Sequence, residues 1–383
     1  DASRRPTGVL HEAASSLLER AIPDPSETEL EAALVRQASA LAKLGVTGCH
    51  DPGELGREAS LERGPLFYRR LASTGRLPLR VHASVRAAQL AQAIELGLRS
   101  GQGVAHETDQ PSARRIADRY RMGWLKLFAD GSLGSRSAAL LEPYDDAAVR
   151  PPTGGGSGML LLPPGELAAL LHRAAEAGIS GQVHAIGDAA VRVALDVLGE
   201  VRAGPLKRRI EHAQLVQPVD QPRFATLGVA ASVQPVHLRT DAPAVRQAWG
   251  ARGQHAFPLR GLANGGALIP FGTDAPVEPA DPWPGIAVAV ARRDPQRPAN
   301  EPLGADHALD LPRSIRGACL DPPLAAGEGD LGRLLAGYRA DLLIVPADGF
   351  RQPVDAAVLA ATRPLLTMID GETVYRDPAF APR

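Results

Sequence analysis

The sequence is poor in cysteine, in long hydrophobic runs and in net charge. Its 383 residues include only two cysteines, Cys49 and Cys319, so a disulfide framework is not expected. We therefore expect a reducing, cytoplasmic location. No uninterrupted apolar stretch is long enough to cross a bilayer. The formal net charge is −1 and basic runs are absent, which argues against nucleic acid as a partner. We therefore expect a small-molecule substrate and neither nucleic acid nor membrane as a partner, and the sequence leaves a homo-oligomer open.

Helical patterns alternate with short hydrophobic runs along most of the chain. Ser26 and Glu29 form a capping-box pattern ahead of a helical stretch that ends at Gly45. Seven strand-like runs follow, at residues 46–51, 79–85, 124–130, 181–188, 208–214, 229–235 and 267–274. Strands that alternate with helices predict parallel βα units.

A closed (β/α)8 barrel of the TIM type needs eight strands, one more than the sequence shows. The chain starts at Asp1 without a methionine, so we interpret the first strand as lying upstream of this sequence. Residues 337–348 and 365–377 are strand-like, the latter with an Asp370-Gly371 turn. We predict an α/β fold with a barrel domain at residues 1–325 and the C-terminal part of a small β-sandwich at residues 326–383.

Chemically active residues fall at or near the ends of the predicted strands. They are His50, Asp51, His82, Lys126, His184, His212 and Asp274. The C-terminal ends of barrel strands carry the active site, so a lysine, two histidines and an aspartate from four runs can converge there. We interpret His50 and His82 as packing or supporting groups. Arg208 and Arg209 are interpreted as surface charges.

Two imidazoles and one carboxylate suit a borderline divalent metal such as zinc. Lys126 is unusual because it interrupts an apolar run, and burial makes an amine lose its proton readily. A neutral amine can take up carbon dioxide and become a carbamate, an anion with two oxygens that is able to bridge two metal ions. Two other readings stay open: Lys126 as a lysine that extends to solvent, and Asp274 as a turn residue.

The ordered motifs resemble those of one family. They are "KLFADGSLGSR" with Lys126, "QVHAIGD" with His184, "RIEHAQ" with His212 and "FGTDAPV" with Asp274, supported by "ASVQPVH" and "GDLGRLLAGYRADLLIVPAD". This set is similar to the amidohydrolase superfamily, most closely to the amidohydrolase family 3 branch with its N-substituted formamide deformylases. The resemblance covers almost the whole chain and implies a metal-dependent hydrolase that cleaves an amide or related C–N bond.

The resemblance also implies roles for individual residues. Lys126 would be the carbamylated ligand between two metals, and His184 and His212 would bind the second metal. Asp274 would bind the first metal and act as general base toward the attacking water. Residues 132–136, with Ser135 and Arg136, and His237 would line the substrate site.

The chain departs from this pattern because it contains no H-x-H pair, which the family carries on its first strand. We therefore expect the sequence to be an N-terminally truncated piece of a longer amidohydrolase. Two other functions remain open: a Schiff-base aldolase that uses Lys126 without a metal, and a degenerate barrel that binds a ligand without catalysis.

Overall fold

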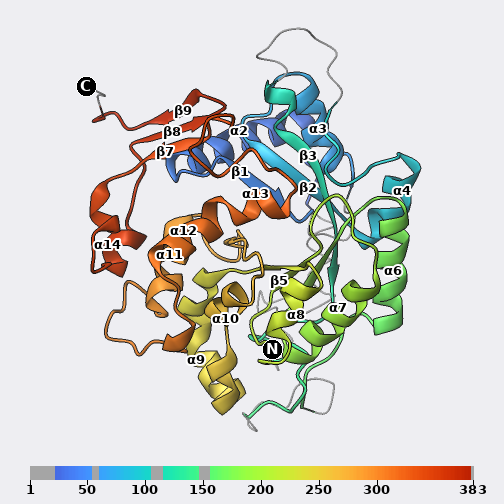
Figure 1. The fold of residues 1–383 in the computed structure, drawn as a ribbon. Coiled ribbons are helices and arrows are strands. Elements are labelled where there is room, and N and C mark those ends of the chain that lie inside the picture. The colour runs from blue at the N-terminus through green and yellow to red at the C-terminus, as the bar shows by residue number, and fades with distance from the viewer. Residues whose placement is uncertain (1–21, 54–59, 105–114, 146–155, 381–383) are drawn as a thin grey trace, which may run out of the picture.

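The predicted strands form one parallel sheet. The computed structural model describes residues 22–53, 60–104, 115–145 and 156–380. Within them, six strands lie in chain order, each parallel to the next (Figure 1). They are β1 (Gly48–Asp51), β2 (Arg80–Arg86), β3 (Tyr120–Phe128), β4 (Gly181–Ala185), β5 (Arg209–His212) and β6 (Ala230–Ser232). The first six predicted strands are therefore confirmed, and their sheet is a partial barrel.

Helices connect successive strands, as the alternating pattern predicts. The α-helices are α2 (Glu27–Lys43), α3 (Pro65–Ser73), α4 (Leu90–Glu95), α6 (Pro164–Glu176), α7 (Asp188–Glu200), α8 (Gln221–Thr226), α9 (Leu238–Trp249), α10 (Leu259–Asn264), α11 (Pro282–Ala291), α12 (Leu311–Cys319), α13 (Asp321–Ala325) and α14 (Ala356–Ala360). The 3-10 helices are η2 (Ala87–Gln89), η3 (Pro235–His237), η4 (Gly250–His255), η5 (Ala305–His307) and η6 (Ala347–Phe350). The predicted capping box at the start of α2 is present, with the Ser26 backbone N–H donating to Glu29 at 2.8 Å. No helix in the described ranges has the length and apolarity needed to cross a membrane.

The prediction of a regular seventh strand at residues 267–274 is wrong. Its backbone follows β6, and the Val233 N–H donates to the Pro270 carbonyl at 2.9 Å. Only Phe271 forms a bridge, with Val233 as its parallel partner. On its other side, the Phe271 N–H donates to the Gly317 carbonyl at the end of α12. Pro270 has no N–H for a ladder, so the segment keeps the direction of a strand without its full pairing.

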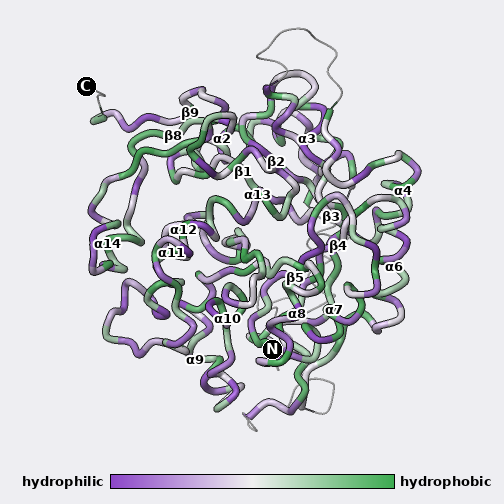
Figure 2. Tube along the Cα trace, in the orientation of Figure 1, coloured by the Kyte–Doolittle hydropathy of each residue, from purple (hydrophilic) through white to green (hydrophobic). Residues whose placement is uncertain are grey.

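The strands and helices enclose the main hydrophobic core on the outer face of the sheet. Leu125 and Leu127 of β3 and Val183 of β4 pack there against leucines of α6 and α7. In Figure 2 both helices alternate between hydrophilic and hydrophobic segments, as expected for helices with one buried face. Because strand side chains alternate, Lys126 lies between two core leucines and points to the opposite, interior face of the sheet.

A second, antiparallel sheet lies near the C-terminus. It has the order β7 (Leu342–Ile344), β8 (Leu366–Ile369) and β9 (Glu372–Arg376). The predicted turn is confirmed, because Asp370 (φ 53°) and Gly371 (φ 80°) both have the positive φ of a type I′ turn. Figure 1 shows this sheet beside α2, where the Thr367 hydroxyl donates to the Ala42 carbonyl at 2.7 Å. The domain boundary at residue 325 stays a prediction.

A buried network of ion pairs joins the barrel strands to the C-terminal sheet. The Arg80 guanidinium of β2 donates two hydrogen bonds to Asp341, both at 2.8 Å, and also contacts Asp370. Next to it, Arg119 donates to Glu372 at 3.1 Å and contacts Asp370. The side chains of Arg80, Asp341 and Asp370 are only 5–7% exposed. The network therefore holds together segments about 260 to 290 residues apart in the sequence.

Replacing Arg80 by alanine is expected to lower the free energy of unfolding by about 3–5 kcal/mol, because it leaves the buried carboxylate of Asp341 without its cation and removes one of the cations beside Asp370. Chemical denaturation measures this loss. Arg70→Ala is the control, since Arg70 pairs with Glu27 at the surface and such pairs contribute about 0–1 kcal/mol. An Arg80 variant as stable as the Arg70 variant would contradict the role of the network.

Candidate active site

The structure brings Lys126, His184 and His212 together on three adjacent strands. Lys126 lies on β3, His184 on β4 and His212 at the end of β5. The two imidazole rings contact each other edge to face, with centroids 4.5 Å apart. The charge of Lys126 acts electrostatically on both histidines and on Asp274, which follows the Phe271 bridge. The predicted convergence of these four side chains is therefore present in the fold.

Lys126 is buried in the barrel interior, with 5% of its surface exposed. Its Nζ lies 4.9 Å from the centroid of the Phe128 ring and forms no hydrogen bond with another described residue. Burial lowers the pKa of the amine to about 8, while Glu211 and Asp274 act in the opposite direction. With this pKa, about one amine in ten is neutral near pH 7. The side chain does not extend to solvent, so the interpretation of Lys126 as a lysine that extends to solvent is wrong.

His184 is fixed by the loop that follows β3. Its Nε2 lies 3.0 Å from the Gly131 carbonyl oxygen. A carbonyl only accepts, so Nε2 carries the proton and Nδ1 keeps a lone pair. Burial lowers the pKa of His184 to about 4, and Lys126 acts in the same direction. Residue 131 must be a glycine, because a Cβ there would lie 2.0 Å from the Ser137 hydroxyl oxygen.

His212 enters the site through an unusual backbone conformation. Its φ is +73°, in the left-handed region, which turns the chain at the end of β5. Its Nδ1 is buried and has no hydrogen-bond partner among the described residues. The ring of His237 stacks near it, with centroids 5.8 Å apart. Burial holds the pKa of His212 well below its usual range, with His184 and Lys126 acting in the same direction.

Asp274 lies at the more open edge of the site, with 36% of its side chain exposed. Its φ of +57° begins a turn in which the Val277 N–H donates to the Asp274 carbonyl at 2.8 Å. One carboxylate oxygen lies 4.0 Å from Nε2 of His237. Burial raises the pKa of Asp274, while His237 and Lys126 act to lower it. Asp274 is thus both a turn residue and a carboxylate directed at the site.

The sequence analysis missed a polar chain in the interior beside Lys126. Ser84 donates to the Gln182 amide oxygen at 3.1 Å, and the Gln182 amide donates to Glu211 at 3.0 Å. Glu211 also binds Arg209. Burial favours a raised pKa for Glu211, but Arg209 and Lys126 hold it below its usual range. Glu211 is therefore an anion that faces the Lys126 amine.

The interpretation of Arg208 and Arg209 as surface charges is wrong. Arg209 is 4% exposed and lies over the Trp124 ring at 4.4 Å. Arg208 donates to the carbonyls of Leu198 and Leu227, at the C-terminal ends of two helices. Both guanidinium groups are thus buried structural groups, that of Arg209 in the barrel interior and that of Arg208 among the helices outside the sheet.

Asp130 organises the loop that follows β3. It is fully buried and accepts hydrogen bonds from the N–H groups of Ala139, Ile186 and Gly187 at 2.9–3.0 Å. Asp130 thereby fixes the loop to the end of β4, next to His184. The sequence signal is its position, because Asp130 ends the predicted run, residues 124–130, that contains Lys126.

The loop residues predicted to contact substrate follow Gly131, whose carbonyl oxygen contacts His184. Ser135 is exposed, and its hydroxyl is hydrogen-bonded to the hydroxyls of Ser132 and Ser137. Arg136 is 9% exposed and donates to the Leu133 carbonyl at 2.8 Å. Their role as substrate contacts stays a prediction.

His50 and His82 lie deeper in the interior. Their rings contact each other at 4.8 Å, and Nδ1 of His50 lies 2.7 Å from the Arg209 guanidinium. His82 faces Glu328 at 3.5 Å. This agrees with their interpretation as packing groups.

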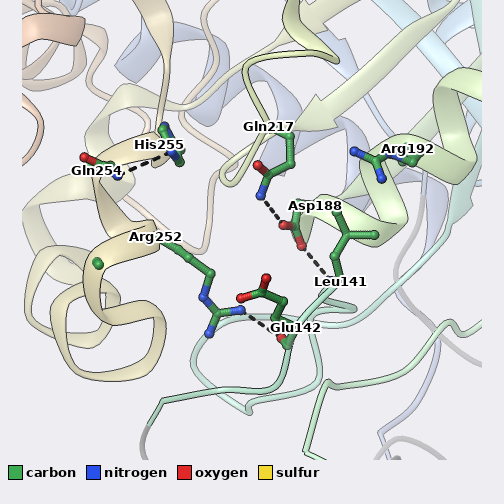
Figure 3. Close-up of a pocket in the computed structure, with 9 residues that line it drawn as sticks. Leu141, Glu142, Asp188, Arg192, Gln217, Arg252, Gln254 and His255 are labelled. Atoms are coloured by element: carbon green, nitrogen blue, oxygen red, sulfur yellow. Dashed lines mark hydrogen bonds between the residues drawn. The ribbon is translucent and has the colours of Figure 1, made fainter.

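A separate cavity of about 270 Å³ opens on the loops after β3, β4 and β5 (Figure 3). Figure 3 shows Gln217 donating to Asp188, which also accepts from the Leu141 N–H. Its arginines already pair with carboxylates: Arg192 with Asp220 at 2.9 Å, and Arg252 with Asp145 at 3.0 Å. Both arginines of this cavity are therefore already neutralised by ion pairs.

The side chains at the site fit a divalent metal with the help of the lysine. Within the described ranges, no three His, Cys, Asp or Glu side chains are arranged to hold a metal by themselves. The available donors are the unpartnered Nδ1 of His212 and the lone pair on His184 Nδ1, both on neutral rings. Metals require neutral imidazole, so the two lowered pKa values agree with this use. Lys126 is the natural third donor once it carries an anionic group.

Comparison with known proteins identifies the family. The model of the amidohydrolase family, Amidohydro_3, matches residues 1–375. The putative amidohydrolase YtcJ of Bacillus subtilis is 30% identical over 384 residues, which cover 98% of this chain and 67% of that protein. The N-substituted formamide deformylase of Arthrobacter pascens is 27% identical over 388 residues, 98% of this chain and 66% of that protein.

The solved structures agree with this assignment. An uncharacterized metal-dependent hydrolase from Pyrococcus furiosus matches with a TM-score of 0.68 and 31% identity, over 85% of this chain and 61% of that one. The chain thus spans about two-thirds of the length of these relatives. With a family model that matches nearly all of it, the chain belongs to the amidohydrolase family.

Proposed function

We propose that this chain supplies the catalytic barrel of a metal-dependent hydrolase that cleaves an amide or related non-peptide C–N bond in a small molecule. The observation that carries the proposal is the convergence of a buried lysine of lowered pKa, two neutral histidines and a carboxylate. A relative named N-substituted formamide deformylase and a solved structure named a metal-dependent hydrolase support this class of reaction.

In the proposed site, Lys126, His184 and His212 hold a divalent metal, zinc by the chemistry of its nitrogen and oxygen donors. The neutral Lys126 amine adds to the carbon of carbon dioxide and loses a proton, which gives a carbamate with two oxygen donors. When bound, the metal would lower the pKa of water and polarise the scissile carbonyl.

Asp274 is the proposed general base. Its partly open position lets it take a proton from the attacking water and later return it to the leaving amine. Ser135, Arg136 and His237 are proposed to contact the substrate. We further propose that the chain divides into a barrel at residues 1–325, of the (β/α)8 type when complete, and a part of a β-sandwich at residues 326–383.

Metal removal and restoration test the proposal. The purified chain is treated with a chelator, assayed against N-substituted formamides and N-acyl amines, and then reloaded with zinc, manganese or cobalt in bicarbonate buffer. We expect hydrolysis to fall at least about 100-fold without metal and to return with it. Hydrolysis that persists in metal-free protein would contradict the proposal.

A Schiff-base enzyme is the second candidate, because a buried lysine of lowered pKa also suits imine formation. Borohydride in the presence of a carbonyl substrate would then attach the substrate covalently to Lys126. Mass spectrometry of the peptide that contains Lys126 distinguishes this reaction from hydrolysis.

A further inference from the structure

Gln214 connects His237 to a carboxylate on a neighbouring helix. It lies two residues beyond His212 and is 3% exposed. Its Nε2 lies 3.2 Å from Oδ2 of Asp241, in the first turn of α9, and 3.4 Å from Nδ1 of His237. One side-chain amide thus reaches both groups.

The carboxylate determines which way the Gln214 amide faces. A carboxylate oxygen accepts hydrogen bonds, so the NH₂ end of the amide is the end that lies next to Asp241. An NH₂ group has two N–H bonds, and the second is available to His237 Nδ1. Nδ1 then accepts with its lone pair, and the proton of the neutral His237 ring resides on Nε2.

Nε2 of His237 is buried and has no hydrogen-bond partner among the described residues. It lies 4.0 Å from the Asp274 carboxylate, which is longer than a hydrogen bond. The N–H is therefore aimed at the site without being used by Asp274. The stacking of His237 near His212 holds the ring beside the proposed metal ligands.

We propose that Gln214, oriented by Asp241, is a positioning residue that fixes His237 in the tautomer with its proton on Nε2. His237 thereby presents a hydrogen-bond donor for the carbonyl oxygen of the substrate. This consequence rests on the proposed hydrolase function, because a hydrolysed amide develops negative charge on that oxygen. The tautomer itself depends only on the contacts of Gln214.

The tautomer is tested by nitrogen NMR of the full chain with ¹⁵N-labelled histidine. His237→Asn identifies the signals of His237 by their loss. We expect wild-type His237 to show a protonated Nε2 and an unprotonated Nδ1. In Gln214→Leu we expect a mixture of the two tautomers. In Gln214→Glu, where a carboxylate faces Nδ1, we expect the proton on Nδ1.

A matched control is Gln217→Leu, three residues further on. Gln217 also donates to an aspartate, Asp188, but contacts neither His237 nor Asp274. This variant should leave the His237 signals unchanged. A wild-type His237 protonated on Nδ1, or a tautomer that is identical in wild type and Gln214→Leu, would overturn the proposal.

Kinetics provide the second measurement. Gln214→Leu should lower kcat about 10–100-fold, as loss of a supporting hydrogen bond typically does, with KM within about twofold of wild type. Gln217→Leu should stay within about twofold for both parameters. A loss of kcat with an unchanged tautomer would reduce Gln214 to a structural role and overturn the proposal. If the wild-type chain hydrolyses nothing, the hydrolase proposal fails, and the NMR result still decides the role of Gln214.

Discussion

Replacing Lys126 by methionine is expected to lower the rate of hydrolysis by at least about 1,000-fold. Methionine keeps the apolar stem in the barrel interior and removes the amine, so the carbamate cannot form. The metal supplies several kcal/mol of stabilisation to the transition state, and each 1.36 kcal/mol corresponds to a factor of ten in rate. Steady-state assays with reloaded metal measure the effect.

The sequence offers a matched control, because it contains only three lysines, Lys43, Lys126 and Lys207. Lys207 is exposed and lies just before β5, at the end of that strand opposite to His212, so Lys207→Met should leave the rate unchanged. The folded state of the Lys126 variant is checked by circular dichroism and thermal unfolding. Full activity in a folded Lys126→Met variant would rule out a carbamate at this position.

Asp274→Asn is expected to lower kcat by about 10²–10⁴-fold, the usual contribution of general acid–base catalysis. Asparagine preserves the shape of the side chain but cannot take a proton from water. Lys126, His184 and His212 remain, so the variant should keep the metal that they hold. Kinetics combined with elemental analysis separate loss of the base from loss of metal.

Asp281→Asn is the control for this variant. Burial raises the pKa of Asp281 as it does that of Asp274, but Asp281 caps α11 and pairs with Arg363. Asparagine is an equally good cap, so kcat should stay within about twofold of wild type. If Asp274→Asn retains more than about a third of the wild-type kcat, the base must be a different residue.

The order of elements and the position of the candidate site could be predicted from the sequence. Alternating helical and strand-like runs indicated the parallel sheet, and turn chemistry indicated the Asp370-Gly371 hairpin, because both signals are local. The location of the candidate site could be predicted from the positions of its residues along the strands. Lys126, His184 and His212 come at or near the ends of adjacent strands, and a parallel sheet brings those ends together.

What the sequence could not provide is the set of partners for each side chain. Strand alternation places Glu211 on the same face as Arg209, so His212 would point the other way in a regular strand. The positive φ of His212 turns it into the site, and a sequence pattern does not contain that angle.

The prediction of a seventh strand was wrong for a different reason. Residues 267–274 have strand composition, but Pro270 lacks a donor and the Phe271 N–H pairs with the carbonyl of Gly317 on a distant helix. Arg208 and Arg209 were misinterpreted because charged residues are usually exposed. The burial of Arg208 depends on helix carbonyls that only the fold brings to it, and that of Arg209 depends on the Trp124 ring of a neighbouring strand.

The proposed hydrolase function depends on a metal held by Lys126, His184 and His212. Its most direct test is elemental analysis of bound metal per chain, in parallel for the wild-type chain and for Lys126→Met, after dialysis against zinc and bicarbonate. We expect about one tightly bound metal per wild-type chain and its loss in the variant. A folded wild-type chain without metal, or equal metal content in both proteins, would contradict it.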